Sequence, residues 1–307
     1  MIDKPAGLTS HDVVNRLRRL TGQRSVGHTG TLDPAATGVL PVALGSATKV
    51  ISHIADTSKT YIAEITFGVQ TDTYDIDGTI TAIRDVGVLS ATAISAALTQ
   101  FIGPTVQRVP AYSAVQRDGV RLYSLARKGV EFELPEREIV IFSVDLLKWN
   151  SPTATICVDC GPGTYIRSLA SDLGALLNTG AHLSNLVRIR SGGFTIEQAW
   201  TLKQLAQIEL ESQFASLAVH PDSPIQGNPA IIISRDEQRL WDHGNPTAIA
   251  QIKAGTLVRA YSEDGDWIGF GTVRGTSDAH FVQPVKVVNL LSNLGQSASA
   301  GTPAAHG

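Results

Sequence analysis

The sequence predicts an α+β fold, and three observations support this prediction. Strand-like and helix-like segments alternate over residues 1–220 without the regular strand–helix–strand spacing of doubly wound α/β proteins. Residues 230–290 then contain short strand-like runs separated by glycine turns, which indicates a small β-rich domain. The chain has 307 residues, of which 43% are hydrophobic, so it can form about two domains with real cores.

The pattern of the first part predicts a helix that Ser10 caps and Gly22 ends. The apolar residues of this helix share one face: Val13, Val14, Leu17 and Leu20. Alternation of apolar and polar residues predicts a strand over 59–68. Further strands are expected over 138–147 and 153–160, and further helices over 91–101, 166–177 and 202–217.

The second part follows a proline-rich stretch at 220–229, which we interpret as a linker because proline cannot sit inside regular elements. Strands are expected at 256–261, 266–273 and 284–289. The small polar tail at 291–307 is expected to be disordered.

Charge does not identify a partner by itself. The net charge is −3, but residues 1–60 carry seven Lys and Arg residues against four Asp residues. An acidic total therefore leaves room for a local basic groove without giving evidence for one. The alternative to a basic groove is an ordinary solvated surface of mixed charge.

Several classes of protein are excluded or disfavoured. No apolar run approaches the roughly 20 residues that cross a bilayer, and the first residues lack the layout of a secretory signal. Only Cys157 and Cys160 are present, which excludes a disulfide scaffold. We therefore expect a soluble, cytoplasmic protein.

Known cofactor and metal motifs do not fit either. Cys157 and Cys160 lie three apart in a predicted strand, so they point to opposite faces and we interpret them as core residues. The acidic run around Asp75 lacks the register of a calcium loop. Phosphate-loop, dinucleotide and nucleophile-elbow motifs are missing from the sequence. We expect no metal and no cofactor.

One turn-rich segment, GHTGTLDPAATGVLP at residues 27–41, stands out. Its single carboxylate is Asp33, and Pro34 disfavours helical geometry at that aspartate. Three glycines allow the backbone to approach another group closely. Asp33 either forms a local turn bond or serves as an ionised nucleophile or base on a rigid loop.

A catalytic aspartate needs partners, and a second glycine turn offers two. Tyr165 and Arg167 follow Gly161-Pro-Gly163 and lie two residues apart, so on an extended strand end both would share one face. An arginine beside a buried carboxylate keeps it ionised. Alone, Arg167 would be read as a surface residue.

The segment at 27–41 resembles the catalytic loop of the TruB family of bacterial tRNA pseudouridine synthases, which are related to the dyskerin-type enzymes. Further blocks resemble the family in order along the chain: DKPAGLTSHDVV, SKTYIAEITFG, TDTYDIDG, PAYSAVQRDGVRLYSLARKG, GTYIRSLASDLG and GAHLSNLVRIRSGGF. Six ordered blocks over roughly 190 residues make the resemblance specific. The β-rich part resembles a short PUA domain more weakly.

The resemblance implies a pseudouridine synthase fold, with a mixed and largely antiparallel sheet and flanking helices. It implies a catalytic domain at 1–222 with an RNA-clasping insertion at 109–137, a linker at 223–230, a PUA-like RNA-binding domain at 231–290 and a tail at 291–307. The family's leading strand is short or missing at the start of this numbering. The implied activity is isomerisation of the T-arm uridine 55 of tRNA to pseudouridine, without a cofactor and by a monomer.

The resemblance also implies roles for individual residues. Asp33 is the nucleophile, and Arg167 pairs with it and keeps the pKa of its carboxyl low. Tyr61 stacks on the target base, although its alternation alone would make it a core ring. The remaining implied substrate contacts are His28, Tyr165 and Leu186.

Two alternatives stay open. A dyskerin-like enzyme would act through a guide RNA, but the small terminal domain and the scarcity of basic tails argue against it. A non-catalytic tRNA-binding or tRNA-folding module would not need Asp33, Tyr61 and Arg167 together.

Overall fold

A computed structural model of the chain describes residues 1–50, 57–113, 115–117, 119–127, 130, 132–208, 214, 216–249, 252–275 and 280–288. Two compact units make up the chain. The first comprises residues 1–10, 31–40 and 56–204, and the second comprises residues 11–30, 41–55 and 205–307. Both units draw on the start of the chain, so no single cut along the sequence separates them. The boundaries proposed from the resemblance stay a prediction.

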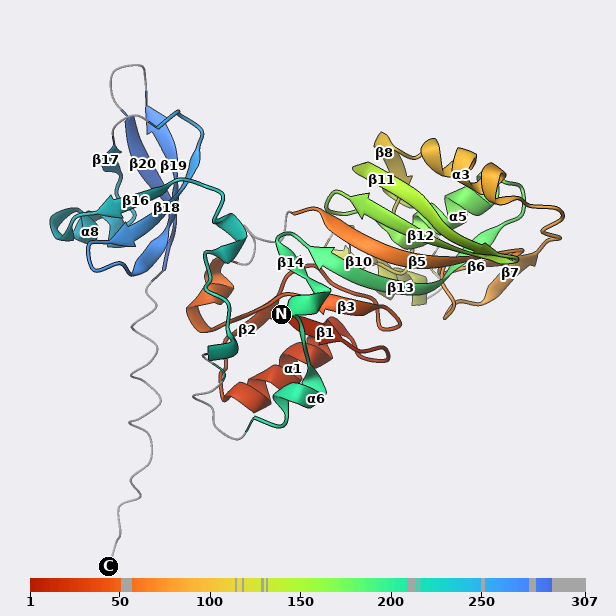
Figure 1. The fold of residues 1–307 in the computed structure, drawn as a ribbon, viewed down its shortest axis with the longest axis horizontal. Coiled ribbons are helices and arrows are strands. Elements are labelled where there is room, and N and C mark those ends of the chain that lie inside the picture. Colours follow the sequence, from red (N-terminus) through yellow and green to blue (C-terminus); the bar gives the residue numbers. More distant parts are fainter. Residues whose placement is uncertain are drawn as a thin grey trace, which may run out of the picture. The chain divides into compact units, whose positions relative to one another are not determined.

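A nine-stranded sheet forms the first unit, in the order β15-β1-β3-β13-β5-β12-β11-β8 with β14 paired to β13 (Figure 1). Only β1–β15 and β13–β3 pair in parallel among these described strands, which confirms the mixed, largely antiparallel sheet. The strands have these bounds: β1 Ile2–Lys4, β3 Thr37–Leu40, β5 Lys59–Phe67, β8 Gly103–Arg108, β11 Glu136–Asn150, β12 Thr153–Cys160, β13 Ala181–Ser191, β14 Phe194–Thr195 and β15 Trp200–Thr201.

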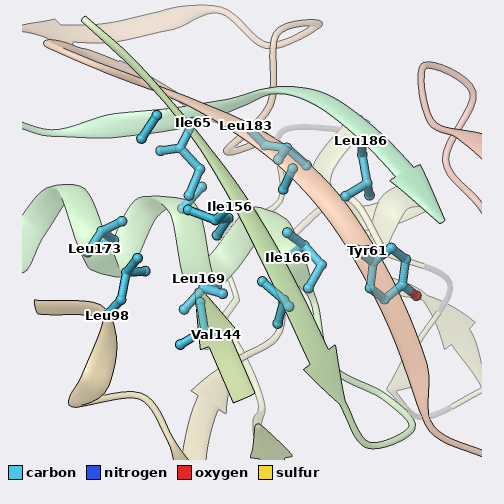
Figure 2. Close-up of a cluster of buried hydrophobic side chains, with 14 of the residues drawn as sticks. Tyr61, Ile65, Leu98, Val144, Ile156, Ile166, Leu169, Leu173, Leu183 and Leu186 are labelled. Carbon is cyan, nitrogen blue, oxygen red and sulfur yellow. The ribbon is translucent and has the colours of Figure 1, made fainter. Parts of the chain in front are cut away.

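Helices α3 (Ala91–Thr99) and α5 (Ile166–Leu176) supply the side chains that cover one face of this sheet. Strand β5 buries every second residue, as its alternation predicts, and Ile65 belongs to the buried hydrophobic cluster (Figure 2). Ile156 of β12 and Leu169 of α5 meet there as well. The confirmed alternation fixes which side chains of β5 enter the core.

The smaller elements of the first unit connect these strands. They are the hairpin β6 Val69–Thr71 and β7 Ile80–Ile83, the hairpin β9 Gln116–Arg117 and β10 Val120–Arg121, the helix α4 Leu122–Arg127 and the short turn η2 Ile196–Gln198. The described parts of the predicted RNA-clasping insertion thus contain a small hairpin and a short helix.

The second unit contains a five-stranded sheet in the order β16-β18-β19-β20-β17. Its core centres on the fully buried Trp241, whose indole donates a hydrogen bond to the carbonyl of Ile268 at 3.1 Å. This sheet confirms the small β-rich domain. The unit's elements are β2 Val26–His28, β4 Val42–Leu44, η1 Gly45–Val50, η3 Ser223–Ile225, β16 Ala230–Ile233, α8 Arg235–Asp242, β17 Thr247–Ile249, β18 Leu257–Ser262, β19 Trp267–Gly275 and β20 His280–Val287.

Two helices contain residues at which the chain passes from one unit to the other. Helix α1 spans Ser10–Thr21, close to its predicted length, and α6 spans Leu202–Leu205. The single helix predicted over 202–217 is wrong in its extent, because α6 ends at Leu205 and residues 206–208 are not helical. Residues 209–213 and 215 lie outside the described part of the chain. The proline-rich stretch was expected to lack regular structure, but η3 lies inside it. That expectation is wrong because proline is well accommodated in the first turn of a helix.

Candidate active site

The loop that carries Asp33 is fastened on both sides of the aspartate. The Ser10 hydroxyl accepts a hydrogen bond from the Leu32 amide at 2.9 Å and donates one to the Leu32 carbonyl at 3.1 Å. The Gly7 amide donates to the Pro34 carbonyl at 2.9 Å. The predicted capping role of Ser10 is therefore wrong, because helix α1 begins at Ser10 itself and the hydroxyl holds the loop instead.

Lys4 is a fully buried cation beneath this loop. Its Nζ donates to the carbonyls of Pro5 at 2.9 Å, Leu8 at 2.7 Å and Pro34 at 3.1 Å. Backbone carbonyls thus replace the water that a buried ammonium loses. The same charge lies close enough to Asp33 to favour the ionised carboxylate and lower its pKa.

The structure explains why position 38 of the segment is a glycine. Its φ is +101°, and a Cβ at this position would lie 2.2 Å from the backbone oxygen of Arg188. The close approach lets β3 pair with β13, where Gly38 lies opposite Arg188. Only glycine tolerates this combination of backbone angle and contact, so the loop leaves Asp33 along one fixed path.

Arg167 contacts Asp33 directly. Its Nε lies 3.0 Å from Asp33 Oδ2, and its Nη2 donates to Asp33 Oδ1 at 3.4 Å. The arginine side chain is only 5% exposed, whereas the aspartate side chain is 42% exposed. The structure therefore brings together two residues 134 positions apart and leaves the carboxylate accessible from one side.

The guanidinium of Arg167 also joins two further segments to the carboxylate. Nη1 donates to the Thr73 carbonyl at 3.2 Å and lies 3.4 Å from Asp75 Oδ2. Nη2 donates to the Tyr112 carbonyl at 3.1 Å. The guanidinium is thus held by three separate parts of the chain, at Asp33, at Thr73 to Asp75 and at Tyr112.

Helix α5, not a strand, positions Arg167. The chain leaves β12 at Cys160, turns through Gly163 with φ +80° and enters the helix at Ile166, with Tyr165 as the N-cap residue. The expectation that Tyr165 and Arg167 share a face of an extended strand is therefore wrong. Glycine at a positive φ redirects the chain before a strand can continue.

Burial raises the pKa of Asp33 above its ordinary value, because desolvation outweighs the opposing attraction of Arg167. The neighbouring carboxylate of Asp75 raises this pKa as well. The expected low pKa is therefore wrong in its net direction, although Arg167 acts in the expected sense. The guanidinium is shared between two carboxylates, which limits its effect on either one.

Tyr61 and Leu186 lie at one end of the hydrophobic cluster, on neighbouring strands (Figure 2). Tyr61 is 7% exposed and Leu186 is 8% exposed. Burial raises the pKa of Tyr61, and the charge of Asp33 acts in the same direction, while the cation of Arg188 opposes both. Tyr61 is thus a ring of the hydrophobic core that also lies within reach of the Asp33 charge. Burial in the core is therefore compatible with a role at the site.

Tyr165, the N-cap residue of helix α5, is partly buried. Burial raises the pKa of its hydroxyl, while the charges of Arg137 and Arg167 lower it. The Asp33 charge also reaches Tyr165 and raises its pKa. His28 ends strand β2 and belongs to the second unit.

Three charged residues around the site were not singled out from the sequence: Asp75 and Lys4, whose charges act on Asp33, and Arg188, whose charge acts on Tyr61. Asp75 lies in the segment TDTYDIDG, which contributes to the resemblance, but neither the residue pattern nor the resemblance assigned a role to Asp75. Lys4 and Arg188 are fully buried charges, and a buried Arg188 could have been suspected because it alternates with Leu186 on β13. Its Nε donates to the Val39 carbonyl at 2.8 Å.

The described residues contain no cluster of three or more His, Cys, Asp and Glu side chains that could hold a metal ion. Among the helices described, none is both long and apolar enough to cross a membrane. The thiol of Cys160 is buried, and desolvation raises its pKa to about 11, so it stays protonated as a core residue.

Comparison with known proteins reveals matches over both halves of the site. A family model described as the N-terminal domain of TruB family pseudouridylate synthases matches residues 18–166. A second model, the C-terminal domain of tRNA pseudouridylate synthase B, matches residues 167–218. Asp33 lies in the first matched region and Arg167 begins the second.

Curated relatives extend the similarity along most of the chain. A tRNA pseudouridine synthase B of Trichormus variabilis is 40% identical over 279 residues, which cover 89% of this chain and 93% of the relative. One of Symbiobacterium thermophilum is 49% identical over 232 residues, covering 74% and 78%. Among solved structures, a chain of a Cbf5–Nop10–Gar1 complex is similar with a TM-score of 0.71 and 27% identity, covering 94% of this chain and 83% of that one.

Proposed function

The chain belongs to the TruB family of pseudouridylate synthases, and from this premise we propose that it isomerises uridine 55 in the tRNA T arm to pseudouridine, with Asp33 as the nucleophile. The single observation that carries the proposal is the half-open carboxylate of Asp33 against the buried guanidinium of Arg167. A surface aspartate in a simple turn would not need a buried cation with four contacts.

The reaction requires that one bond is exchanged for another. The N1–C1′ bond of the nucleoside breaks, the uracil turns, and C5 bonds to C1′. N1 gains a proton and C5 loses one, so product and substrate have the same composition. Asp33 would attack either ribose C1′ or uracil C6, or stabilise a glycal-like intermediate, and an ionised carboxylate suits each route.

The raised pKa of Asp33 makes the reaction depend on pH. Only the ionised carboxylate is a nucleophile, so turnover should rise as the pH passes through a pKa above the ordinary aspartate value. The cations of Arg167 and Lys4 work against this shift and keep more of the carboxylate ionised.

The uridine must leave its stack to reach Asp33, which costs a few kcal/mol. Stacking on an aromatic ring contributes about 1–3 kcal/mol per base and can offset that cost. We assign this contact to Tyr61, with Leu186 as an apolar wall and Tyr165 at the opposite flank. A T loop with splayed bases suits such recognition better than a plain duplex.

The proposal is tested with the purified chain and an unmodified T-arm hairpin. Pseudouridine at position 55 is expected from the unmodified chain. Asp33→Asn should reduce turnover at least about 10³-fold and leave RNA affinity largely intact, because phosphate contacts supply most of the binding. A hairpin with cytidine at position 55 is the substrate control. Normal turnover by the Asp33→Asn variant would falsify the nucleophile assignment.

A guide-dependent activity is the second candidate, because the similar solved chain belongs to a Cbf5 complex. The higher identity to tRNA pseudouridine synthase B relatives favours the stand-alone enzyme. The same hairpin assay separates the two. An active purified chain excludes a requirement for accessory proteins, and an inactive one would favour the guided form.

A further inference from the structure

Gln107, near the end of strand β8, grips the backbone of Tyr165 with both ends of its side-chain amide. Its Oε1 accepts a hydrogen bond from the Tyr165 amide at 2.8 Å, and its Nε2 donates to the Tyr165 carbonyl at 3.0 Å. The two residues are 58 positions apart, and Gln107 is only 4% exposed. An amide that satisfies both backbone groups of one residue fixes that residue in position and orientation.

The backbone of Tyr165 is not held in place by the side chain of Tyr165 itself. Tyr165 is the N-cap of helix α5, and within the described chain its side chain makes no capping hydrogen bond. It follows the turn containing Gly163, whose φ of +80° is accessible mainly to glycine. A capping side chain usually holds the start of a helix by accepting from the amides of its first turn. Here Gln107 of strand β8 holds the amide and carbonyl of the N-cap residue itself.

The first turn of α5 is also where the helix meets the candidate active site. Arg167 follows Tyr165 by two residues and places its guanidinium against Asp33. The body of the helix is held separately, by the buried side chains of Leu169, Ala170 and Leu173. Loss of the amide contact should therefore loosen the first turn without releasing the helix from the core.

We propose that Gln107 is a positioning residue for pseudouridine formation, which sets the place of Tyr165 and, through the first turn of α5, the contact between Arg167 and Asp33. This inference rests on the proposed function. The hydrogen bonds of Gln107 go to the backbone of Tyr165, so Gln107 acts on the site through the backbone that it holds.

The chain offers a matched control one turn along the same helix. The Ser168 hydroxyl donates to the Arg108 carbonyl at 2.8 Å, and Ser168 is 2% exposed. This bond joins the same two elements, β8 and α5, but does not touch Tyr165. A general loss of contact between strand and helix would appear equally in both variants, whereas a positioning effect would appear only at Gln107.

The experiment compares Gln107→Met, Gln107→Asn and Ser168→Ala in single-turnover assays on the T-arm hairpin. Methionine keeps the size of Gln107 without its hydrogen bonds, and asparagine keeps the amide but is one methylene too short. Both Gln107 variants should lower the single-turnover rate constant about 10- to 100-fold, the cost of small misplacements of reacting groups. Their RNA affinity should stay within about 3-fold.

Ser168→Ala should retain its rate constant within about 3-fold, since it loses one ordinary hydrogen bond. Thermal melts of all variants establish that the assay temperature lies below unfolding; if Gln107→Met melts too early, Gln107→Asn supplies the comparison. Wild-type rates in a folded Gln107 variant would overturn the inference. Equal losses in the Gln107 and Ser168 variants would overturn it too, by assigning the effect to strand–helix docking.

A pH profile distinguishes positioning from a reduced fraction of folded enzyme. Displacement of Arg167 removes a cation that lowers the pKa of Asp33, so the acid limb of the Gln107 variants should move to higher pH. Other charged or titratable groups coupled to Asp33 are Lys4, Tyr61, Asp75 and Tyr165. An unmoved acid limb with a lower plateau would indicate only a structural role. Inactivity of the unmodified chain would refute the proposed function instead.

Discussion

Asp33 and Asp222 are each paired with an arginine, but their surroundings shift the pKa of the carboxyl group in opposite directions. Asp33 in the first unit has a pKa raised by burial, and it accepts a hydrogen bond from Arg167. Asp222 in the second unit is 4% exposed on its side chain, and burial also raises its pKa. There, hydrogen bonds from Tyr261, His220 and Arg259 outweigh burial, so the net pKa is lowered.

The difference lies in how many donors point at each carboxylate. Arg259 donates to Asp222 Oδ2 at 3.0 Å, the Tyr261 hydroxyl donates to the same oxygen, and His220 contacts Oδ1. A carboxylate with several donors is stable and unreactive because its lone pairs are occupied. Asp33 keeps free surface and fewer donors, which suits a nucleophile and costs stability.

The largest expected effect is on the structural carboxylate. Asp222→Asn should lower the free energy of unfolding by about 2–4 kcal/mol, because it removes the charge that pairs with the largely buried Arg259. Denaturation followed by intrinsic fluorescence, to which the buried Trp241 and Trp267 of this unit contribute, measures the loss. Asp264→Asn is the control, since its pair with Arg235 is exposed and should contribute under about 1 kcal/mol.

Asp33→Asn should behave in the opposite way. It removes a desolvated charge, and Arg167 keeps Asp75 as its ionic partner, so the free energy of unfolding should be equal to or slightly above that of the unmodified chain. Chemical denaturation at neutral pH measures the difference. A loss as large as that of Asp222→Asn would mean that the Asp33–Arg167 pair is a structural salt bridge.

The pH dependence of stability sharpens the same contrast. Because the folded pKa of Asp222 is lowered, its stabilising contribution is present above the unfolded pKa and is lost as pH falls through the folded pKa. Because the folded pKa of Asp33 is raised, the fold is favoured below the unfolded pKa, and this advantage is lost as pH rises through the folded pKa. Denaturation of both variants across acidic to neutral pH should therefore give differences from the unmodified chain that shrink toward acid. Differences independent of pH would contradict the assignment.

The sequence predicts the frame of the molecule better than its electrostatics. Strand β5 and helix α1 follow from local periodicity. Each buries one face, so its apolar residues recur with the period of a strand or of a helix. Strand β12 has the predicted bounds, Thr153–Cys160. Such patterns depend on neighbours in the chain, so one sequence is enough to find them.

The site depends on contacts between distant segments, which no local pattern records. The net pKa of Asp33 depends on how Asp75 shares Arg167, and the place of Tyr165 depends on Gln107. The resemblance supplied Asp33 and Arg167, but Gln107 and Lys4 have meaning only once the strands are assembled. Those residues look like ordinary polar positions in the sequence.

The smallest expected effect concerns how Arg167 divides its charge between two carboxylates. Asp75 lies 3.4 Å from Nη1 of Arg167 and raises the pKa of Asp33. Asp75→Asn removes that negative charge but keeps an oxygen near the guanidinium, so the acid limb of the turnover profile should move to lower pH.

Asp77→Asn is the control for this shift, because Asp77 is an exposed carboxylate two residues further along. Its acid limb should stay in place, since exposed charges are screened by solvent. A limb that moves to higher pH in Asp75→Asn would mean that Asp75 serves mainly to hold Arg167 against Asp33. In that case the geometric loss of the cation would exceed the electrostatic gain from losing a neighbouring anion.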